Sequence, residues 1–283
     1  MPPTRIGAAI RPDGSEAQIR PGAEPIRVDA AGPDAVGVLL IHGFTGSPAA
    51  WRPLAGVLAD RGHAVRVPLL PGHGTRWQDA NSTSWRQWYE TVEAAFDELQ
   101  ATTRAVVVAG LSMGGALALR LAQQRGSQLA GLVLVNPAIA SADQRLRLLP
   151  VLRRIGASLP SIGSDIAAGG GEVGYDRTPL HALATMTGLW RVVCADLTRV
   201  TQPLLLFRSR TDHVVDQASA ALIRTWTRPV SAEWVTLLRS YHVATLDHDA
   251  PEIAHRTTGF VDRVTRPDTV AADPGSPVVG KDS

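Results

Sequence analysis

The sequence has 283 residues, of which 45% are hydrophobic and 19% charged, and its formal net charge is +2. This length fits one large α/β domain, and the near balance of charge gives no sign of a nucleic-acid-binding surface. The single cysteine, Cys194, excludes an intrachain disulfide and is interpreted as a small buried apolar residue. Neither an apolar leader nor an apolar run of membrane-spanning length is found, so we expect a cytoplasmic protein.

The first part of the chain is expected to lead into a parallel sheet. Residues 1–25 are rich in Pro, Gly and Ala and predict a flexible lead-in, followed by a short edge strand at residues 26–28. Residues 36–41 form a continuous apolar run, which is typical of a strand covered on both faces. Ser47 and Pro48 supply an N-cap and a first-turn proline for a helix that extends to about residue 60.

A second strand and a second helix follow. Residues 64–70 predict a strand, and Thr83 or Ser84 caps a helix that ends near residue 100 and has an apolar stripe at helical spacing. Trp77, Trp85 and Trp88 resemble a platform for a sugar or a base, but their spacing favours core and crevice wall.

The segment around Ser112 organises the rest of the chain. An apolar run ends at Gly110-Leu111-Ser112-Met113-Gly114, and helix-forming residues begin directly afterwards. A strand, a tight turn and a helix with serine at the apex form a nucleophile elbow. A G-x-S-x-G match can also arise by chance, but the flanking strand and helix argue against chance here.

The alternation of strands and helices predicts a mostly parallel, doubly wound sheet with helices on both faces. The core is expected to comprise residues 26–136 and 200–265. Between them, residues 137–199 lack the regular alternation of strands and helices, which predicts a small inserted cap over the carboxyl ends of the strands. Within it, residues 145–149 alternate Arg and Leu; a membrane-surface helix is one interpretation, and a cap helix is favoured because Pro150 follows. Residues 266–283 predict a disordered tail.

A serine nucleophile needs a base, and the base needs an acid that fixes its tautomer. In doubly wound hydrolases these residues occur in the order Ser, Asp or Glu, His. Asp212 and His242 each follow a predicted strand, so we expect them at the same edge of the sheet as Ser112. Asp216 is a rival acid that also suits a helix N-cap. His213 and His248 are rival bases.

An oxyanion needs preorganised N–H donors. We expect one from the backbone of Met113, at the start of a helix, and one from Phe44, in the loop after the first long strand. Phe44 also suits a pocket wall, and His42 is expected to brace this loop. No metal-ligand spacing is present, and no cofactor is expected.

With these residues the chain resembles the α/β-hydrolase superfamily, and within it the bacterial carboxylesterases and monoacylglycerol lipases. The resemblance runs from about residue 37 to residue 264, and its specific parts are His-Gly-Phe-Thr-Gly at 42–46, Gly-His-Gly-Thr at 72–75, Gly-Leu-Ser-Met-Gly-Gly at 110–115, Ser-Ile-Gly-Ser-Asp at 161–165 and Ser-Tyr-His-Val-Ala-Thr-Leu-Asp at 240–247. It implies hydrolysis of a monoacylglycerol to glycerol and a fatty acid, with transient contact to a membrane surface. A general carboxylesterase, thioesterase or perhydrolase, and a catalytically silent lipid- or protein-binding module, are the alternatives.

The resemblance also implies a polar pocket for the glycerol group. Its residues fall on Asn136, Ile162 and Glu172 in this sequence. The flexible run Gly169-Gly170-Gly171 departs from the family pattern and puts the position of Glu172 in doubt, so a solvated cap charge is an equal interpretation. Asn136 also suits a turn at the end of a strand.

Overall fold

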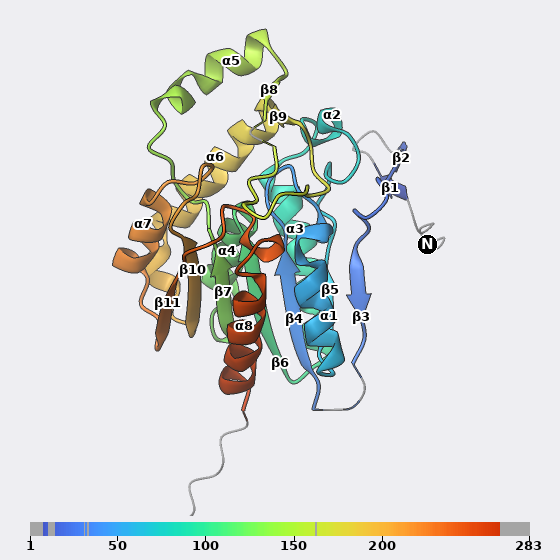
Figure 1. Cartoon of the computed structure of the whole chain (residues 1–283), viewed down its shortest axis with the longest axis vertical. Coiled ribbons are helices and arrows are strands. Elements are labelled where there is room, and N and C mark those ends of the chain that lie inside the picture. The colour runs from blue at the N-terminus through green and yellow to red at the C-terminus, as the bar shows by residue number, and fades with distance from the viewer. Residues whose placement is uncertain (1–7, 11–14, 31, 33, 162, 267–283) are drawn as a thin grey trace, which may run out of the picture.

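The computed structural model describes residues 8–10, 15–30, 32, 34–161 and 163–266. In these residues, the centre of the molecule is a seven-stranded sheet with the order β11-β10-β7-β6-β4-β5-β3, and only β3 runs antiparallel to its neighbour (Figure 1). This architecture confirms the predicted α/β-hydrolase fold. The strands are β3 (Ile26–Val28), β4 (Val36–Ile41), β5 (Ala64–Val67), β6 (Ala105–Leu111), β7 (Leu129–Val135), β10 (Leu204–Ser209) and β11 (Ala232–Leu237).

The direction in which the chain winds changes between β4 and β6. From β4 the chain continues to β5 on one side, and from β6 it continues through β7, β10 and β11 on the other. In open α/β sheets ligands bind outside the carboxyl ends of the strands at such a switch point. The loop after β4 and the elbow after β6 therefore meet where a site is expected.

Helices cover both faces because alternate residues of the buried strands point to opposite sides. Leu39 and Ile41 of β4 belong to the core under α3, α4 and α6, whereas Val38 and Leu40 belong to the core under α1 and α8. The helices are α1 (Arg52–Asp60), α2 (Trp77–Ala80), α3 (Trp85–Thr102), α4 (Met113–Arg125), α5 (Leu149–Ile155), α6 (Leu180–Ala195), α7 (Ala218–Trp226) and α8 (Ala250–Val264), with 3-10 turns at Pro48–Trp51, Gly126–Gln128, Gln144–Leu148, Leu197–Arg199 and Ala244–Leu246.

The segment between β7 and β10 contains α5, α6 and a two-stranded sheet of β8 (Ser158–Pro160) and β9 (Arg177–Pro179). Figure 1 shows α5, β8 and β9 above the sheet, at the end to which the β4 arrow points. No described helix has both the length and the apolar character needed to cross a bilayer.

The described part of the expected lead-in is packed rather than loose. Strands β1 (Ala8–Ile10) and β2 (Glu16–Gln18) pair antiparallel, and Ala17 and Ala23 are buried. Arg20 donates hydrogen bonds to the carbonyl oxygens of Thr75 and Gly174. These long-range contacts order a stretch whose composition alone predicts flexibility. Of the expected tail, only residue 266 lies within the described residues.

Candidate active site

Ser112 lies between β6 and α4 with φ of 54° and ψ of −118°, a strained conformation for a residue with a side chain. The close approach of the backbone on both sides explains its neighbouring glycines. A Cβ atom on Gly110 would lie 2.2 Å from the carbonyl oxygen of Gly114, and one on Gly114 would lie 2.1 Å from that of Ile41. The glycines thus permit the turn that raises the serine to the end of the sheet.

Asp212 and His242 lie together, each in a loop that follows a strand. The Nδ1 atom of His242 is 2.9 Å from Oδ2 of Asp212, and the carboxylate is fully buried. Oδ1 of Asp212 accepts hydrogen bonds from the backbone N–H groups of Val214 and Val215 at 2.9 and 2.8 Å. Burial alone would raise the pKa of Asp212, but these hydrogen bonds and the contact with His242 lower it below its usual value. The acid is therefore charged and oriented toward the imidazole.

Ser112 and His242 line the same cavity, which has a volume of about 240 Å³. No hydrogen bond joins the Ser112 hydroxyl to the imidazole among the described residues. Catalytic hydrogen bonds are often long in free enzymes and tighten when substrate binds. The structure thus brings the three predicted residues to one end of the sheet, with the serine–histidine contact still open.

The rival residues have other partners. Asp216 accepts hydrogen bonds from the N–H groups of Ala218, at the start of α7, and of Ala142. His213 is half exposed and its Nδ1 atom is 2.8 Å from Asp165. His248 is exposed and does not line the cavity, whereas His242 lines it with Ser112 and contacts Asp212.

The loop after β4 lies against the serine. A Cβ atom on Gly43 would lie 3.3 Å from Cβ of Ser112, and Phe44 lines the cavity. His42 is buried, accepts the N–H of Leu70 through Nε2, and lies 2.9 Å from the carbonyl oxygen of Gly43 through Nδ1. Burial lowers its pKa to about 3, so the ring is neutral and braces the loop as expected. Met113 is the first residue of α4, where backbone N–H groups have no acceptor within the helix.

Glu172 reaches the cavity despite the three glycines before it. It lines the cavity with Ser112, and its Oε1 atom is buried without a hydrogen-bond partner. Burial raises the pKa of this carboxyl to about 7, while nearby His242 and the backbone N–H of Ser47 lower it by less. A buried acceptor without a partner beside the nucleophile can receive a hydroxyl group of a ligand.

The other two expected glycerol residues are placed differently. Asn136 does not line the cavity: its Nδ2 donates to the His242 carbonyl and to Ser209 Oγ, at 2.8 and 2.9 Å, and its Oδ1 accepts the Ser209 N–H. With φ of 43°, it is a strand-end turn residue that braces the histidine loop. Ile162 lies outside the described residues, although Ser161 and Gly163 line the cavity.

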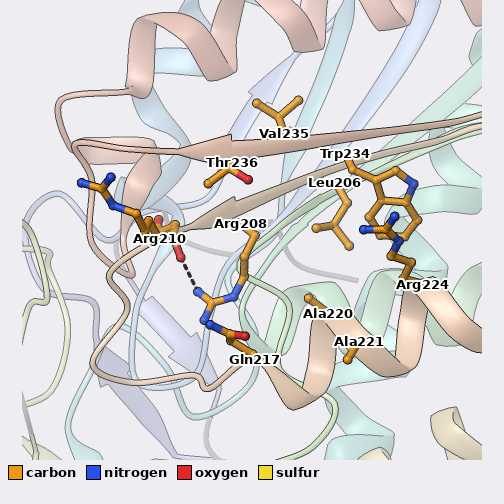
Figure 2. Close-up of a pocket in the computed structure, with 11 residues that line it drawn as sticks. Leu206, Arg208, Arg210, Gln217, Ala220, Ala221, Arg224, Trp234, Val235 and Thr236 are labelled. Atoms are coloured by element: carbon orange, nitrogen blue, oxygen red, sulfur yellow. Dashed lines mark hydrogen bonds between the residues drawn. The ribbon is translucent and has the colours of Figure 1, made fainter.

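Two residues near the site are not evident in the sequence. Arg208 lies 3.3 Å from Oδ2 of Asp212 through Nη1 and donates to the Val215 carbonyl through Nη2. It also lines a second cavity of about 420 Å³ between β10, β11 and α7, where Figure 2 shows its guanidinium group. There its Nη1 donates a hydrogen bond to the backbone oxygen of Ser209. Asp165 contacts the backbone of His242 from the inserted segment. The contacts of Arg208 are local, with residues one to seven positions along the chain, whereas Asp165 reaches His242 across 77 residues.

Among the described residues, no group of His, Cys, Asp and Glu could hold a metal ion.

Known proteins are similar to this chain over most of its length. The chain is 40% identical over 245 residues to a thermostable monoacylglycerol lipase of Bacillus sp. (strain H-257), covering 84% of this chain and 94% of the lipase. It is 23% identical over 235 residues to a carboxylesterase of Bacillus subtilis (strain 168), covering 80% of this chain and 92% of that protein.

A solved structure from a study of two metagenome-derived lipolytic enzymes, LipS and LipT, superposes with a TM-score of 0.83 at 37% identity, covering 87% of this chain and all of that one. The sequence pattern of the alpha/beta hydrolase family matches residues 38–277. The chain therefore belongs to the alpha/beta hydrolase family.

Proposed function

We propose that the protein is a serine esterase that hydrolyses monoacylglycerols to glycerol and a free fatty acid. The observation that carries the proposal is the buried pair of Asp212 and His242, which opens onto the same cavity as Ser112 at the apex of its strained turn. A serine hydroxyl is a weak nucleophile, and this constellation is the means of activating one.

Ser112 attacks the ester carbonyl carbon while His242 takes the hydroxyl proton. The oxyanion of the tetrahedral intermediate accepts hydrogen bonds from the N–H groups of Phe44 and Met113, and each such donor typically lowers the barrier by a few kcal/mol. His242 then protonates the departing alkoxide, and an acyl-enzyme ester remains on Ser112. Water, deprotonated by His242, hydrolyses that ester and regenerates the serine. Asp212 stays charged and stabilises the imidazolium in both steps.

The lining of the cavity supports a substrate with one apolar and one polar end. The apolar part of the wall comes mainly from the inserted segment, residues 137–199, which we propose acts as a cap. This part of the wall includes Leu146, Leu183, Met186 and Trp190. The polar part includes Thr45 and Glu172. An acyl chain suits the first part and the free hydroxyl groups of glycerol suit the second. The similarity to a monoacylglycerol lipase supports the same assignment.

The decisive experiment replaces the nucleophile. For Ser112→Ala we expect glycerol release from a monoacylglycerol to fall by roughly four or more decades in turnover, with the fold retained by circular dichroism. Unchanged turnover would exclude the mechanism. A fluorophosphonate that fails to label Ser112 in the wild-type protein would favour a catalytically silent binding module.

A general carboxylesterase is the second candidate, favoured by the similarity to the Bacillus subtilis enzyme. The two functions differ in the alcohol they accept. Rates on mono-, di- and triacylglycerols of one chain length, with an acyl thioester beside them, separate the two. A monoacylglycerol lipase prefers the first substrate, whereas a general esterase or thioesterase shows no such preference.

A further inference from the structure

Asp165 belongs to the inserted segment, yet its carboxylate lies between the two loops that carry Asp212 and His242. Oδ2 accepts hydrogen bonds from the backbone N–H groups of His213 and His242, both at 3.1 Å. Oδ1 is 2.8 Å from the His213 imidazole, and the Asp165 carbonyl oxygen accepts the N–H of Val243. Asp165 is 8% exposed, so these contacts are shielded from water.

This arrangement joins three distant parts of the chain. Asp165 is 48 residues from His213 and 77 from His242. His213 directly follows the acid Asp212. The Asp165 carboxylate therefore fixes the distance between the loop that carries the acid and the backbone of His242. From the other side, Asn136 holds the His242 carbonyl oxygen at 2.8 Å. The backbone of His242 is thus held by a core residue on one side and by a residue of the insert on the other.

We propose that Asp165 is a positioning residue, which sets how far the His242 imidazole reaches between Asp212 and Ser112. The proposal rests on the function proposed above and adds that the insert helps to assemble the catalytic machinery as well as lining the cavity. No hydrogen bond yet joins Ser112 to His242 among the described residues, so a small shift of the histidine backbone decides whether one forms. A misplacement of about 1 Å can cost roughly a hundredfold in rate.

The insert remains attached to the histidine loop without Asp165. Asp247 accepts hydrogen bonds from the N–H groups of Ala167 and Ala168 in the insert, at 2.7 and 2.9 Å, and from that of Tyr241 at 2.8 Å. None of these contacts involves the His242 residue. Removal of the Asp165 carboxylate should therefore loosen His242 while leaving the insert in place.

Because the amide oxygen of Asp165→Asn could still accept both backbone N–H groups, the test is Asp165→Ala, which removes both acceptor oxygens. On a soluble ester such as p-nitrophenyl butyrate, we expect kcat to fall about 10- to 100-fold and KM to change less than about threefold. The downfield proton resonance of the His242–Asp212 hydrogen bond should broaden, because the imidazole is less firmly held. Asp176→Ala, which removes an exposed carboxylate of the same segment, should alter neither quantity.

The extent of fluorophosphonate labelling at Ser112 after long incubation gives the number of folded active sites. The value of kcat is then calculated per labelled site. If Asp165→Ala keeps kcat within threefold of the wild type, or if its labelling stops short of one probe per chain, the residue is not a positioning residue and the proposal is overturned. Failure of the proposed function would appear separately, as unchanged turnover in Ser112→Ala.

Discussion

Glu172 combines a buried, unpartnered oxygen with a position beside the nucleophile. Because burial raises its pKa to about 7, the carboxyl group is protonated below neutral pH and becomes a charged acceptor above it. A charged acceptor holds glycerol hydroxyl groups more strongly, since hydrogen bonds to charged groups contribute about 1.5–3 kcal/mol.

We therefore expect kcat/KM for a monoacylglycerol, divided by kcat/KM for the p-nitrophenyl ester of the same acid, to rise between pH 6 and pH 8. Any pH dependence of the chemical steps that the two substrates share cancels in the ratio. Glu172→Gln should lower the ratio about tenfold at pH 8 and remove its pH dependence. An unchanged ratio would mean that Glu172 does not contact the glycerol group.

His42 and His73 form a buried ring pair, with centroids 5.1 Å apart, beneath the loop after β4. Burial lowers their pKa values to about 3 and about 4, so both rings are neutral in the folded protein. In the unfolded chain a histidine takes up a proton below about pH 6.5. Their contribution to stability is therefore fully present above pH 6.5 and is lost as the pH falls toward the folded-state pKa values.

Within this window, each fall of one pH unit should lower the free energy of unfolding by about 1.4 kcal/mol for each of the two histidines. Urea titrations between pH 7 and pH 4 measure the slope. His73→Leu should reduce the slope by about one histidine's share, whereas His255→Gln, on the exposed side of α8, should leave it unchanged. Equal slopes for the wild type and His73→Leu would contradict the neutral buried state.

At the scale of elements, the elbow depends on the absence of two side chains. An added Cβ on Gly110 or Gly114 meets backbone atoms at 2.2 or 2.1 Å, and backbone cannot rotate away as a flexible side chain can. Gly110→Ala and Gly114→Ala should each lower the free energy of unfolding by about 3 kcal/mol or more.

Gly56→Ala in α1 is the matched control. No atom lies within 4 Å of its added Cβ, and alanine favours a helix over glycine by about 1 kcal/mol. We expect this variant to be as stable as the wild type or more stable in urea titration. A cost similar to that at Gly110 would show that loss of glycine in itself, and not the close backbone contact, is responsible.

Elements with a strong local signal were predictable from the sequence. The apolar run of β4 occupies residues 36–41 as expected, and Ser84 precedes α3 in a capping box with Gln87. Packing of β2 and the bracing by Asn136 could not be read from the sequence, because both depend on partners distant along the chain. Ser112, Asp212 and His242 could be proposed as a triad from their places after strands. A role for Asp165 could not be proposed, because its partners His213 and His242 are distant along the chain.

At the scale of the whole molecule, α5 lies at one end of the structure (Figure 1). This helix and the turn before it have apolar side chains that are exposed to solvent. Leu148, Val151 and Ile155 are 58%, 57% and 78% exposed, and Arg145, Arg147, Arg153 and Arg154 are exposed among them. Leu146, in the same turn, lines the Ser112 cavity. Apolar side chains mixed with arginines suit contact with an anionic lipid surface, from which a monoacylglycerol would enter.

Ile155→Asp should therefore slow hydrolysis of a monoacylglycerol in phosphatidylglycerol vesicles several-fold, because it replaces an apolar contact of about 1.5–3 kcal/mol at full burial with a charge that the lipid repels. Hydrolysis of p-nitrophenyl butyrate in solution should not change, since Ile155 does not line the cavity. Val230→Asp is the matched control, because Val230 is also 78% exposed but belongs to the loop before β11. If both variants slow the vesicle reaction equally, net charge rather than docking through α5 governs access to the lipid.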